Sequence, residues 1–241
     1  MRSLVWKPGG RAVVAGADGL IHGKAVRLVV NLGTTGGELT HELEDSLSLR
    51  NIKLLDSPVG GGHHGAVKGA LAVMASGDRA LFDEVEPILK TFGSNIVFVG
   101  DKAGMAQTLK LVNNIINSAG FLITCEAMVM GVKAGLDPEV MISVLNSGTG
   151  RNSSTEDKFP REVLTRRFGY GGTVNTSGKD VMLAVAEAEA LGVPMWIGTA
   201  TRQFYHYALA QGAGPQDRTA LVKFIEKLAG AEIPKTREVT Q

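Results

Sequence analysis

The sequence predicts a protein in two parts, an α/β portion followed by an all-helical portion. Over the first hundred residues, short β-type runs alternate with helical ones, which is typical of a mostly parallel sheet. From residue 103 onward only helical patterns occur, and the first of them is a long apolar segment. With 241 residues and 44% hydrophobic content, the chain can also bury a substantial core.

The α/β portion is expected to contain two helices and several short strands. Thr35 followed by Glu38 has capping-box spacing and predicts a helix to about Arg50. A second helix is expected at 79–92, although Pro87 should kink or split it. Strands are expected at 26–32, 52–59, 70–75 and 95–99, and the glycine-dense run 60–65 after the second of them is expected to be a loop.

The helical portion is expected to begin with one helix at 103–134, more than about 40 Å long at about 1.5 Å per residue. This segment is apolar on nearly all faces, which favours burial against other helices or in a homodimer or higher oligomer. Gly135 is a natural C-cap, and Asp137 with Pro138 predicts a further helix to about Asn146. Later helices are expected at 178–191, 195–211 and 217–228, followed by a solvated tail at 231–241.

Charge and cysteine content exclude several classes of protein. The 25 basic and 24 acidic residues form no long runs, so no nucleic-acid or membrane partner is expected, and a small molecule is favoured. A single cysteine, Cys125, cannot build a disulfide framework, which fits a cytoplasmic setting. We expect neither a signal peptide nor a membrane anchor, because polar residues interrupt the longest apolar runs.

Lys110 lies inside the most apolar predicted helix, and Asn113, Asn114 and Asn117 follow on the same face. A buried ammonium must be hydrogen-bonded or lose its charge, and desolvation lowers a lysine's pKa toward the range used for proton transfer. Two interpretations are open. The stripe is either a general acid/base with orienting amides or a polar seam at a helix–helix or subunit interface.

The glycine run after Val59 is the second candidate site. Successive glycines let backbone N–H groups converge on an anion such as a carboxylate, although a glycine-rich flexible turn has the same composition. His63 and His64 are adjacent and would point in opposite directions in an extended segment. We therefore expect no metal site there.

Three segments together resemble one enzyme family. DSPVGGG at 56–62 is similar to DAPVSGG, GMAQTLKLVNN at 104–114 to GxGxxxKxxNN, and KDVMLA at 179–184 to KDLxLA. Their order and spacing resemble those of the 3-hydroxyisobutyrate dehydrogenase-like (β-hydroxyacid dehydrogenase) family over about residues 13–228. The resemblance implies a partial Rossmann-type nucleotide-binding domain followed by an all-α 6-phosphogluconate-dehydrogenase-like domain.

The resemblance also implies an activity, namely reversible hydride transfer between a small 3-hydroxy acid and NAD or NADP. Lys110 would be the catalytic general acid/base. The implied substrate-binding residues are Gly60, Gly61, Gly62, Asn113 and Asn114, and the implied cofactor-binding residues are Thr34, Lys179 and Asp180.

Departures from the family pattern lie mainly at the N-terminal end. Family members begin with a strand, a G-x-G-x-x-G turn and a helix, whereas residues 13–19 here already resemble a later part of that domain. We therefore expect a truncated NAD(P)-binding domain at 1–100, a helical substrate and dimerisation domain at 101–230 and a tail at 231–241. Gly60 replaces the usual serine, and Asn31 replaces the usual aspartate.

Two other interpretations remain open. The chain could be a catalytically impaired family remnant that acts as a non-catalytic oligomerisation module. Alternatively, Met1 is not the true start, and a complete nucleotide domain precedes it.

Overall fold

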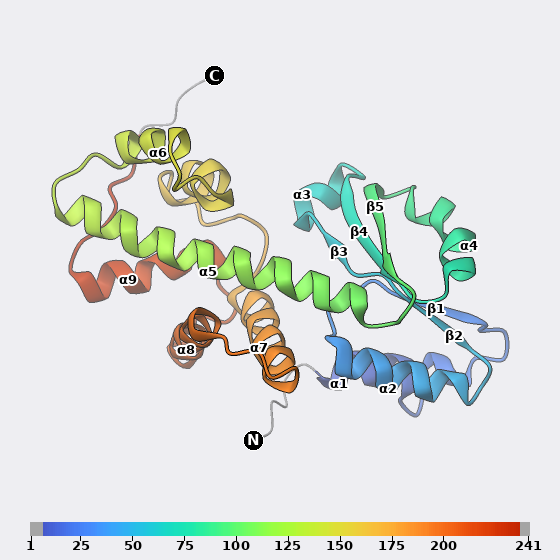
Figure 1. Ribbon diagram of the computed structural model, residues 1–241. Coiled ribbons are helices and arrows are strands. Elements are labelled where there is room, and N and C mark those ends of the chain that lie inside the picture. Colours follow the sequence, from blue (N-terminus) through green and yellow to red (C-terminus); the bar gives the residue numbers. More distant parts are fainter. Residues whose placement is uncertain (1–6, 237–241) are drawn as a thin grey trace. The chain divides into compact units, whose positions relative to one another are not determined.

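The computed structural model describes residues 7–236, and the chain divides into two compact units (Figure 1). Unit 1 comprises residues 1–113 and 183–194, and unit 2 comprises residues 114–182 and 195–241. Helices α5 (Met105–Lys133) and α7 (Val174–Ala190) contribute residues to both units. The division therefore falls within these two helices and not in a linker.

Unit 1 is built on a five-stranded sheet in which β1 pairs parallel with β2, and β4 pairs parallel with β5. Strand β4 runs antiparallel to β2 and β3. The predicted strand at 52–59 is divided, because Ser57 and Pro58 separate β2 from β3. The strands are β1 (Leu28–Asn31), β2 (Lys53–Asp56), β3 (Val59–Gly60), β4 (Leu71–Ser76) and β5 (Gly93–Gly100).

Helices cover both faces of this sheet because successive strand residues point in opposite directions. Leu54 of β2 packs in the core on the α2 side, whereas its neighbour Leu55 packs in the core on the α4 side. Both leucines are at most 5% exposed. The helical segments of unit 1, besides parts of α5 and α7, are α1 (Lys7–Ala15), η1 (Leu20–His22), α2 (Gly37–Ser48), α3 (Gly62–Val67) and α4 (Arg79–Leu89).

Two local predictions for unit 1 were wrong, and a third was wrong in part. The N-cap of α2 is Gly36, because the Thr35 hydroxyl instead contacts Thr40 Oγ1 at 3.1 Å and accepts a bond from Asn31. Pro87 lies inside α4 and does not split it, since the helix continues to Leu89. The run 60–65 is not a loop, since its first residue belongs to β3 and α3 begins two residues later.

Unit 2 is helical, as expected. Asp137 caps α6 by accepting hydrogen bonds from the backbone N–H groups of Glu139 and Val140 at 2.9 and 3.0 Å. Gly135 adopts φ +87° just after α5, in the left-handed conformation that favours glycine. Besides parts of α5 and α7, its helical segments are α6 (Pro138–Ser147), the π-helix η2 (Ser154–Val163), α8 (Trp196–Ala210), η3 (Arg218–Leu221) and α9 (Val222–Ala229).

The predicted solvated tail is wrong at Ile233 and Thr236, although Glu232, Pro234 and Lys235 are exposed. Ile233 is fully buried, and its N–H donates a 3.0 Å hydrogen bond to Glu226. The N–H of Thr236 donates to the carbonyl of Leu164 at 2.9 Å. A single apolar residue gives no periodic signal, so sequence patterning could not reveal this docking. Residues 237–241 lie outside the described part of the chain.

Helix α5 is long and apolar enough to cross a membrane by length and composition alone. Half of its most apolar window is buried inside the protein, and core helices of soluble proteins meet the same criteria. Its remaining surface carries large exposed side chains, including Ile116, Ile123 and Met130, which are 60–70% exposed. The prediction that this helix packs against other helices is therefore confirmed for about half of its apolar window, and the expected burial against a partner subunit stays a prediction.

A buried carboxylate at the end of β2 ties the sheet to the start of α5. Asp56 is fully buried and accepts a 2.7 Å hydrogen bond from the Gln107 side chain. Its other oxygen accepts from the backbone N–H groups of Gly104 and Gln107, both at 3.2 Å. Burial raises the pKa of Asp56 to about 6, while these hydrogen bonds act in the opposite direction.

We predict that Asp56→Asn changes the pH dependence of stability. The pKa of Asp56 is higher in the folded protein than its ordinary value of 3.8, so the folded state holds this proton more tightly between about pH 4 and 6. The contribution of Asp56 to stability therefore falls as pH rises through this window, by up to about 2–3 kcal/mol.

Urea unfolding of both proteins from about pH 4 to 7 measures this effect. The free energy of unfolding of the wild type minus that of Asp56→Asn should decrease as pH rises. A difference that stays constant over this range would contradict the assignment.

Candidate functional site

The structure brings two predicted site residues of unit 1 together. Lys110 lies in the second turn of α5 and is 8% exposed. Its Nζ is 3.7 Å from the point that a Cβ atom on Gly60 would occupy, and Met74 and Ala72 lie at 3.7 and 3.8 Å from the same point. The buried ammonium therefore lies beside the end of β3.

Gly61 and Gly62 continue from this strand into α3. They adopt φ +107° and +60°, conformations that L side chains rarely accept. Both are exposed, as are His63 and His64 in the following helical turn. The glycine segment thus gives an accessible backbone directly after the residue beside Lys110.

Thr34, the predicted cofactor contact, lies half-buried in the turn after β1. This turn is held to α5 by Gln107, whose Oε1 accepts from the N–H groups of Thr35 and Gly36 at 2.8 and 3.1 Å. The parallel strands β1 and β2 end side by side at Asn31 and Asp56. Carboxyl ends of parallel strands are where nucleotides bind in open α/β sheets, so this edge fits an NAD(P) cofactor.

A second cluster of predicted residues lies in unit 2. Asn114 donates a 2.7 Å hydrogen bond to one carboxylate oxygen of Asp180, and Lys179 lies 2.8 Å from the other. This cluster joins the end of the lysine-helix motif to the KDVMLA motif. Asn113 is exposed, whereas Asn117, which was expected on the Lys110 face, accepts a 3.3 Å hydrogen bond from Ser153.

Sequence reasoning missed the roles of Gln107 and Glu187. Gln107 lies three residues before Lys110 and therefore on the same face of the helix. Its place next to the stripe of Lys110 and the asparagines was a signal in the sequence that could have indicated its role. Glu187 accepts a hydrogen bond from the Thr108 hydroxyl and another from the N–H of Gly37 at 3.2 Å. No local pattern connects residues so far apart in the chain.

Lys158 of η2 is a second buried lysine, at 2% exposure. Burial lowers its pKa to about 8, aided by the charge of Arg218. Its Nζ donates to Ser153 at 2.9 Å and lies 5.5 Å from the ring centre of Tyr170. Its ammonium is therefore engaged by a hydroxyl and an aromatic ring of its own unit.

The thiol of Cys125 is also enclosed in the core, and burial raises its pKa.

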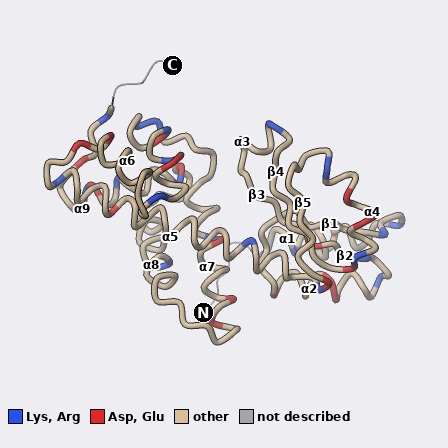
Figure 2. The backbone as a smooth tube through the Cα atoms, turned by 45° about the horizontal axis from the view of Figure 1, so that its top comes forward, with Lys and Arg blue, Asp and Glu red and all other residues tan. Residues whose placement is uncertain are grey.

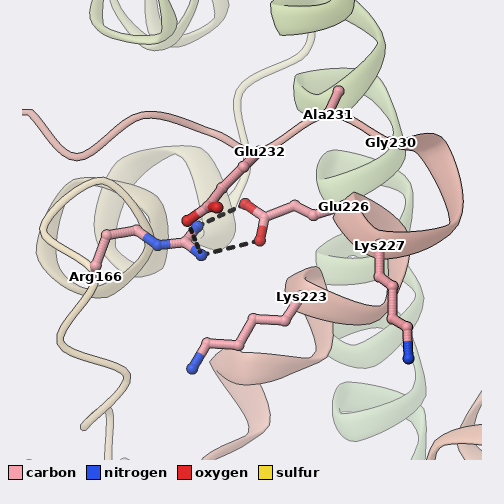
Figure 3. Close-up of a pocket in the computed structure, with 7 residues that line it drawn as sticks. All are labelled: Arg166, Lys223, Glu226, Lys227, Gly230, Ala231 and Glu232. Carbon is pink, nitrogen blue, oxygen red and sulfur yellow. Dashed lines mark hydrogen bonds and ion pairs between the residues drawn. The ribbon is translucent and has the colours of Figure 1, made fainter.

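A pocket in unit 2 is lined by charged residues, but its central charges neutralise one another (Figure 3). Arg166 forms a bidentate pair with Glu226 at 2.5 and 3.0 Å and a third contact with Glu232 at 3.0 Å. Lys223 and Lys227 point away from these carboxylates in Figure 3. This cluster holds the C-terminal segment in place and offers no reactive group.

Among the described residues, Lys and Arg are interspersed with Asp and Glu along the tube in Figure 2. Within residues 7–236 there is also no group of three His, Cys, Asp or Glu side chains that could hold a metal ion.

Comparisons with known proteins agree with this arrangement. The sequence model described as the NAD-binding domain of NADP-dependent 3-hydroxyisobutyrate dehydrogenase matches residues 104–225. The model of the NAD-binding domain of 6-phosphogluconate dehydrogenase matches residues 4–100.

Individual relatives align over most of the chain. A 2-(hydroxymethyl)glutarate dehydrogenase of Eubacterium barkeri is 29% identical over 92% of this chain and 73% of its own length. An uncharacterized oxidoreductase of Bacillus subtilis is 31% identical over 83% and 69%. The crystal structure of a 3-hydroxyisobutyrate dehydrogenase from Salmonella typhimurium superposes with a TM-score of 0.81 at 26% identity, covering 90% of this chain and 76% of that one.

The family profiles confirm that NAD(P) is the cofactor, in agreement with the strand-end geometry of unit 1. The matched region extends through all three motifs, including the segments that contain Lys110 and Lys179. This chain is therefore a member of the 3-hydroxyisobutyrate dehydrogenase-like family of NAD(P)-dependent hydroxyacid dehydrogenases.

Proposed function

We propose that this protein transfers a hydride reversibly between a small 3-hydroxy acid and NAD(P), with Lys110 as the general acid/base. The position of the Lys110 ammonium beside the glycine segment supports the proposal most directly. A proton-transfer group is useful only where a substrate can reach it, and the exposed Gly61 and Gly62 directly follow Gly60, the residue beside Lys110. Lys158, at 2% exposure, is the more enclosed of the two buried lysines.

Each proposed residue has a distinct task. The nicotinamide supplies the hydride acceptor during oxidation and the hydride donor during reduction. Lys110 Nζ takes the proton of the substrate hydroxyl during oxidation and returns it to the carbonyl oxygen during reduction. Backbone N–H groups at Gly61 and Gly62 bind the substrate carboxylate, and Gly60 leaves space beside the ammonium.

The other predicted residues are proposed for binding. Thr34 contacts the cofactor from its turn at the carboxyl end of β1. Asn113 and Asn114 hold the substrate, and the ion pair of Lys179 with Asp180 contributes to cofactor binding. In this proposal, residues 1–100 form the nucleotide-binding domain, and residues 101–230 form the substrate and dimerisation domain. We propose a cytoplasmic location.

The class of substrate is supported by named relatives. One relative is a 2-(hydroxymethyl)glutarate dehydrogenase, and a solved relative is a 3-hydroxyisobutyrate dehydrogenase. Both names describe acids in which a carboxylate and a hydroxymethyl group lie on the same carbon. A glycine-lined carboxylate site next to a lysine suits this shape.

We predict that the chain binds a nicotinamide dinucleotide. Isothermal titration with NAD⁺, NADP⁺ and their reduced forms should give saturable binding by at least one of them. The absence of binding at millimolar concentrations of all four would contradict the proposed activity and favour a non-catalytic oligomerisation module.

We predict that Lys110→Ala lowers kcat by about 100-fold or more, because a positioned general acid/base contributes about 10²–10⁴ in rate. Added primary amines should restore part of the activity. Lys158→Gln is the matched control, since it also removes a buried lysine from the chain but should retain most of the turnover. Turnover that survives in Lys110→Ala would remove Lys110 from this role.

We also propose that the exposed stripe of α5 forms a homodimer interface. Ile116, Ile123 and Met130 are spaced by seven residues, so they follow one side of the helix and remain 60–70% exposed. Large apolar side chains in such a row favour association with a second copy.

The double variant Ile116→Lys/Ile123→Lys should shift the protein from dimer to monomer, because burying two ammonium groups in an apolar interface is unfavourable. Sedimentation velocity measures this change. Leu228→Lys, at a 71% exposed position on α9, is the control and should leave the dimer intact. A wild-type monomer, or a dimer that persists in the double variant, would contradict the interface.

A further inference from the structure

We propose that Gln107 is a positioning residue that holds the turn containing Thr34 in register with Lys110. This inference rests on the proposed function, because it assigns Gln107 the task of fixing the cofactor side of the site relative to the proton-transfer group. Gln107 itself contacts neither substrate nor cofactor in this account.

The hydrogen bonds of Gln107 use both ends of its amide. Its Oε1 accepts from the N–H groups of Thr35 and Gly36, whereas its Nε2 donates to the carbonyl of Gly33 at 2.9 Å and to Asp56 at 2.7 Å. Two donors face the amide oxygen and two acceptors face the amide nitrogen, so the network determines the orientation of the amide. Its side chain is fully buried.

These bonds flank Thr34 in the chain, because the turn residues before and after it are hydrogen-bonded to the same amide. Gln107 and Lys110 are three residues apart on α5, so the helix backbone fixes the distance between them. The same amide also binds Asp56, which lies four residues before Gly60. One side chain thereby connects the turn after β1, the end of β2 and the lysine helix.

No other common side chain makes these four bonds. Leucine fills a similar volume without donors or acceptors and would leave buried backbone groups unpaired. Glutamate keeps the acceptor for Thr35 and Gly36, but it loses both donors and places a second carboxylate against Asp56. Asparagine is one methylene shorter and cannot span the same gap.

Exchanging the donor and acceptor groups between positions 56 and 107 tests this inference. In Asp56→Asn, the introduced amide can still accept from Gly104 and Ser76, but its NH₂ group then faces the NH₂ group of Gln107. In the double variant Asp56→Asn/Gln107→Glu, the asparagine NH₂ faces a carboxylate oxygen instead. The double variant therefore restores the bond that each single variant removes.

The experiment compares the wild type, Asp56→Asn, Gln107→Glu, Gln107→Leu and the double variant. Thr124→Val is the matched control, because Thr124 is also a buried hydrogen-bonding residue of α5. Two readouts are collected for each protein. They are kcat and KM with NAD(P) and a 3-hydroxy acid, and hydrogen exchange at the amides of Thr35 and Gly36.

We expect each single variant at Asp56 or Gln107 to lower kcat by about tenfold or more, since small displacements of reacting groups are costly. KM for the 3-hydroxy acid should change little, and exchange at Thr35 and Gly36 should accelerate. The double variant should recover both kcat and slow exchange relative to either single variant. Thr124→Val should change neither readout beyond its effect on thermal stability.

The inference is overturned if kcat follows thermal stability alone across the whole series, or if the double variant recovers nothing. A wild-type chain that shows no dehydrogenase activity would contradict the proposed function, and exchange then decides the inference separately. Unaltered exchange at Thr35 and Gly36 in Gln107→Leu would show that Gln107 does not hold the turn.

Discussion

The hydrogen-bonded pair of Asp56 and Gln107 determines how unit 1 presents its candidate site. A buried carboxylate is unfavourable unless it is hydrogen-bonded, and Asp56 meets this requirement with side-chain and backbone donors that come mainly from the first turn of α5. The start of α5 is thereby fixed against the ends of β1 and β2. Lys110 follows one turn later, so its position beside Gly60 depends on this attachment.

The sequence was sufficient to predict the parts of the structure that depend on local patterns. Alternating β and helical runs predicted the sheet, and Asp137 with Pro138 predicted the start of α6. It was also sufficient to place Lys110 on a helix. These features depend on residues that are close together in the chain, where spacing and side-chain chemistry carry the information.

Features that depend on distant contacts were not predicted. Thr35 and Glu38 had the spacing of a capping box, but the Thr35 hydroxyl is instead engaged with Asn31 and Thr40. Ile233 had no periodic neighbours, although it is fully buried. Gln107 lay inside a recognised motif, yet its importance became apparent only when its partners in the turn after β1 and at the end of β2 were known. Such partners are determined by tertiary packing.

The proposed chemistry follows from a contrast between two buried lysines. Lys158 is enclosed by its own unit at 2% exposure. Lys110 lies next to a strand end whose following glycines are exposed. The place of Lys110 beside this strand end, more than the burial of its ammonium, supports it as the proton-transfer group.

Deuterium transfer reports directly on the proposed hydride step. A set of small 3-hydroxy acids, each deuterated at the carbon that carries the hydroxyl, is incubated with the protein and NAD⁺ or NADP⁺, and the reduced nucleotide is examined by mass spectrometry. We expect the wild type to transfer deuterium from at least one acid to the nucleotide, and we expect Lys110→Ala to lose nearly all of this transfer. No transfer from any acid, or equal transfer by the variant, would contradict the proposed function.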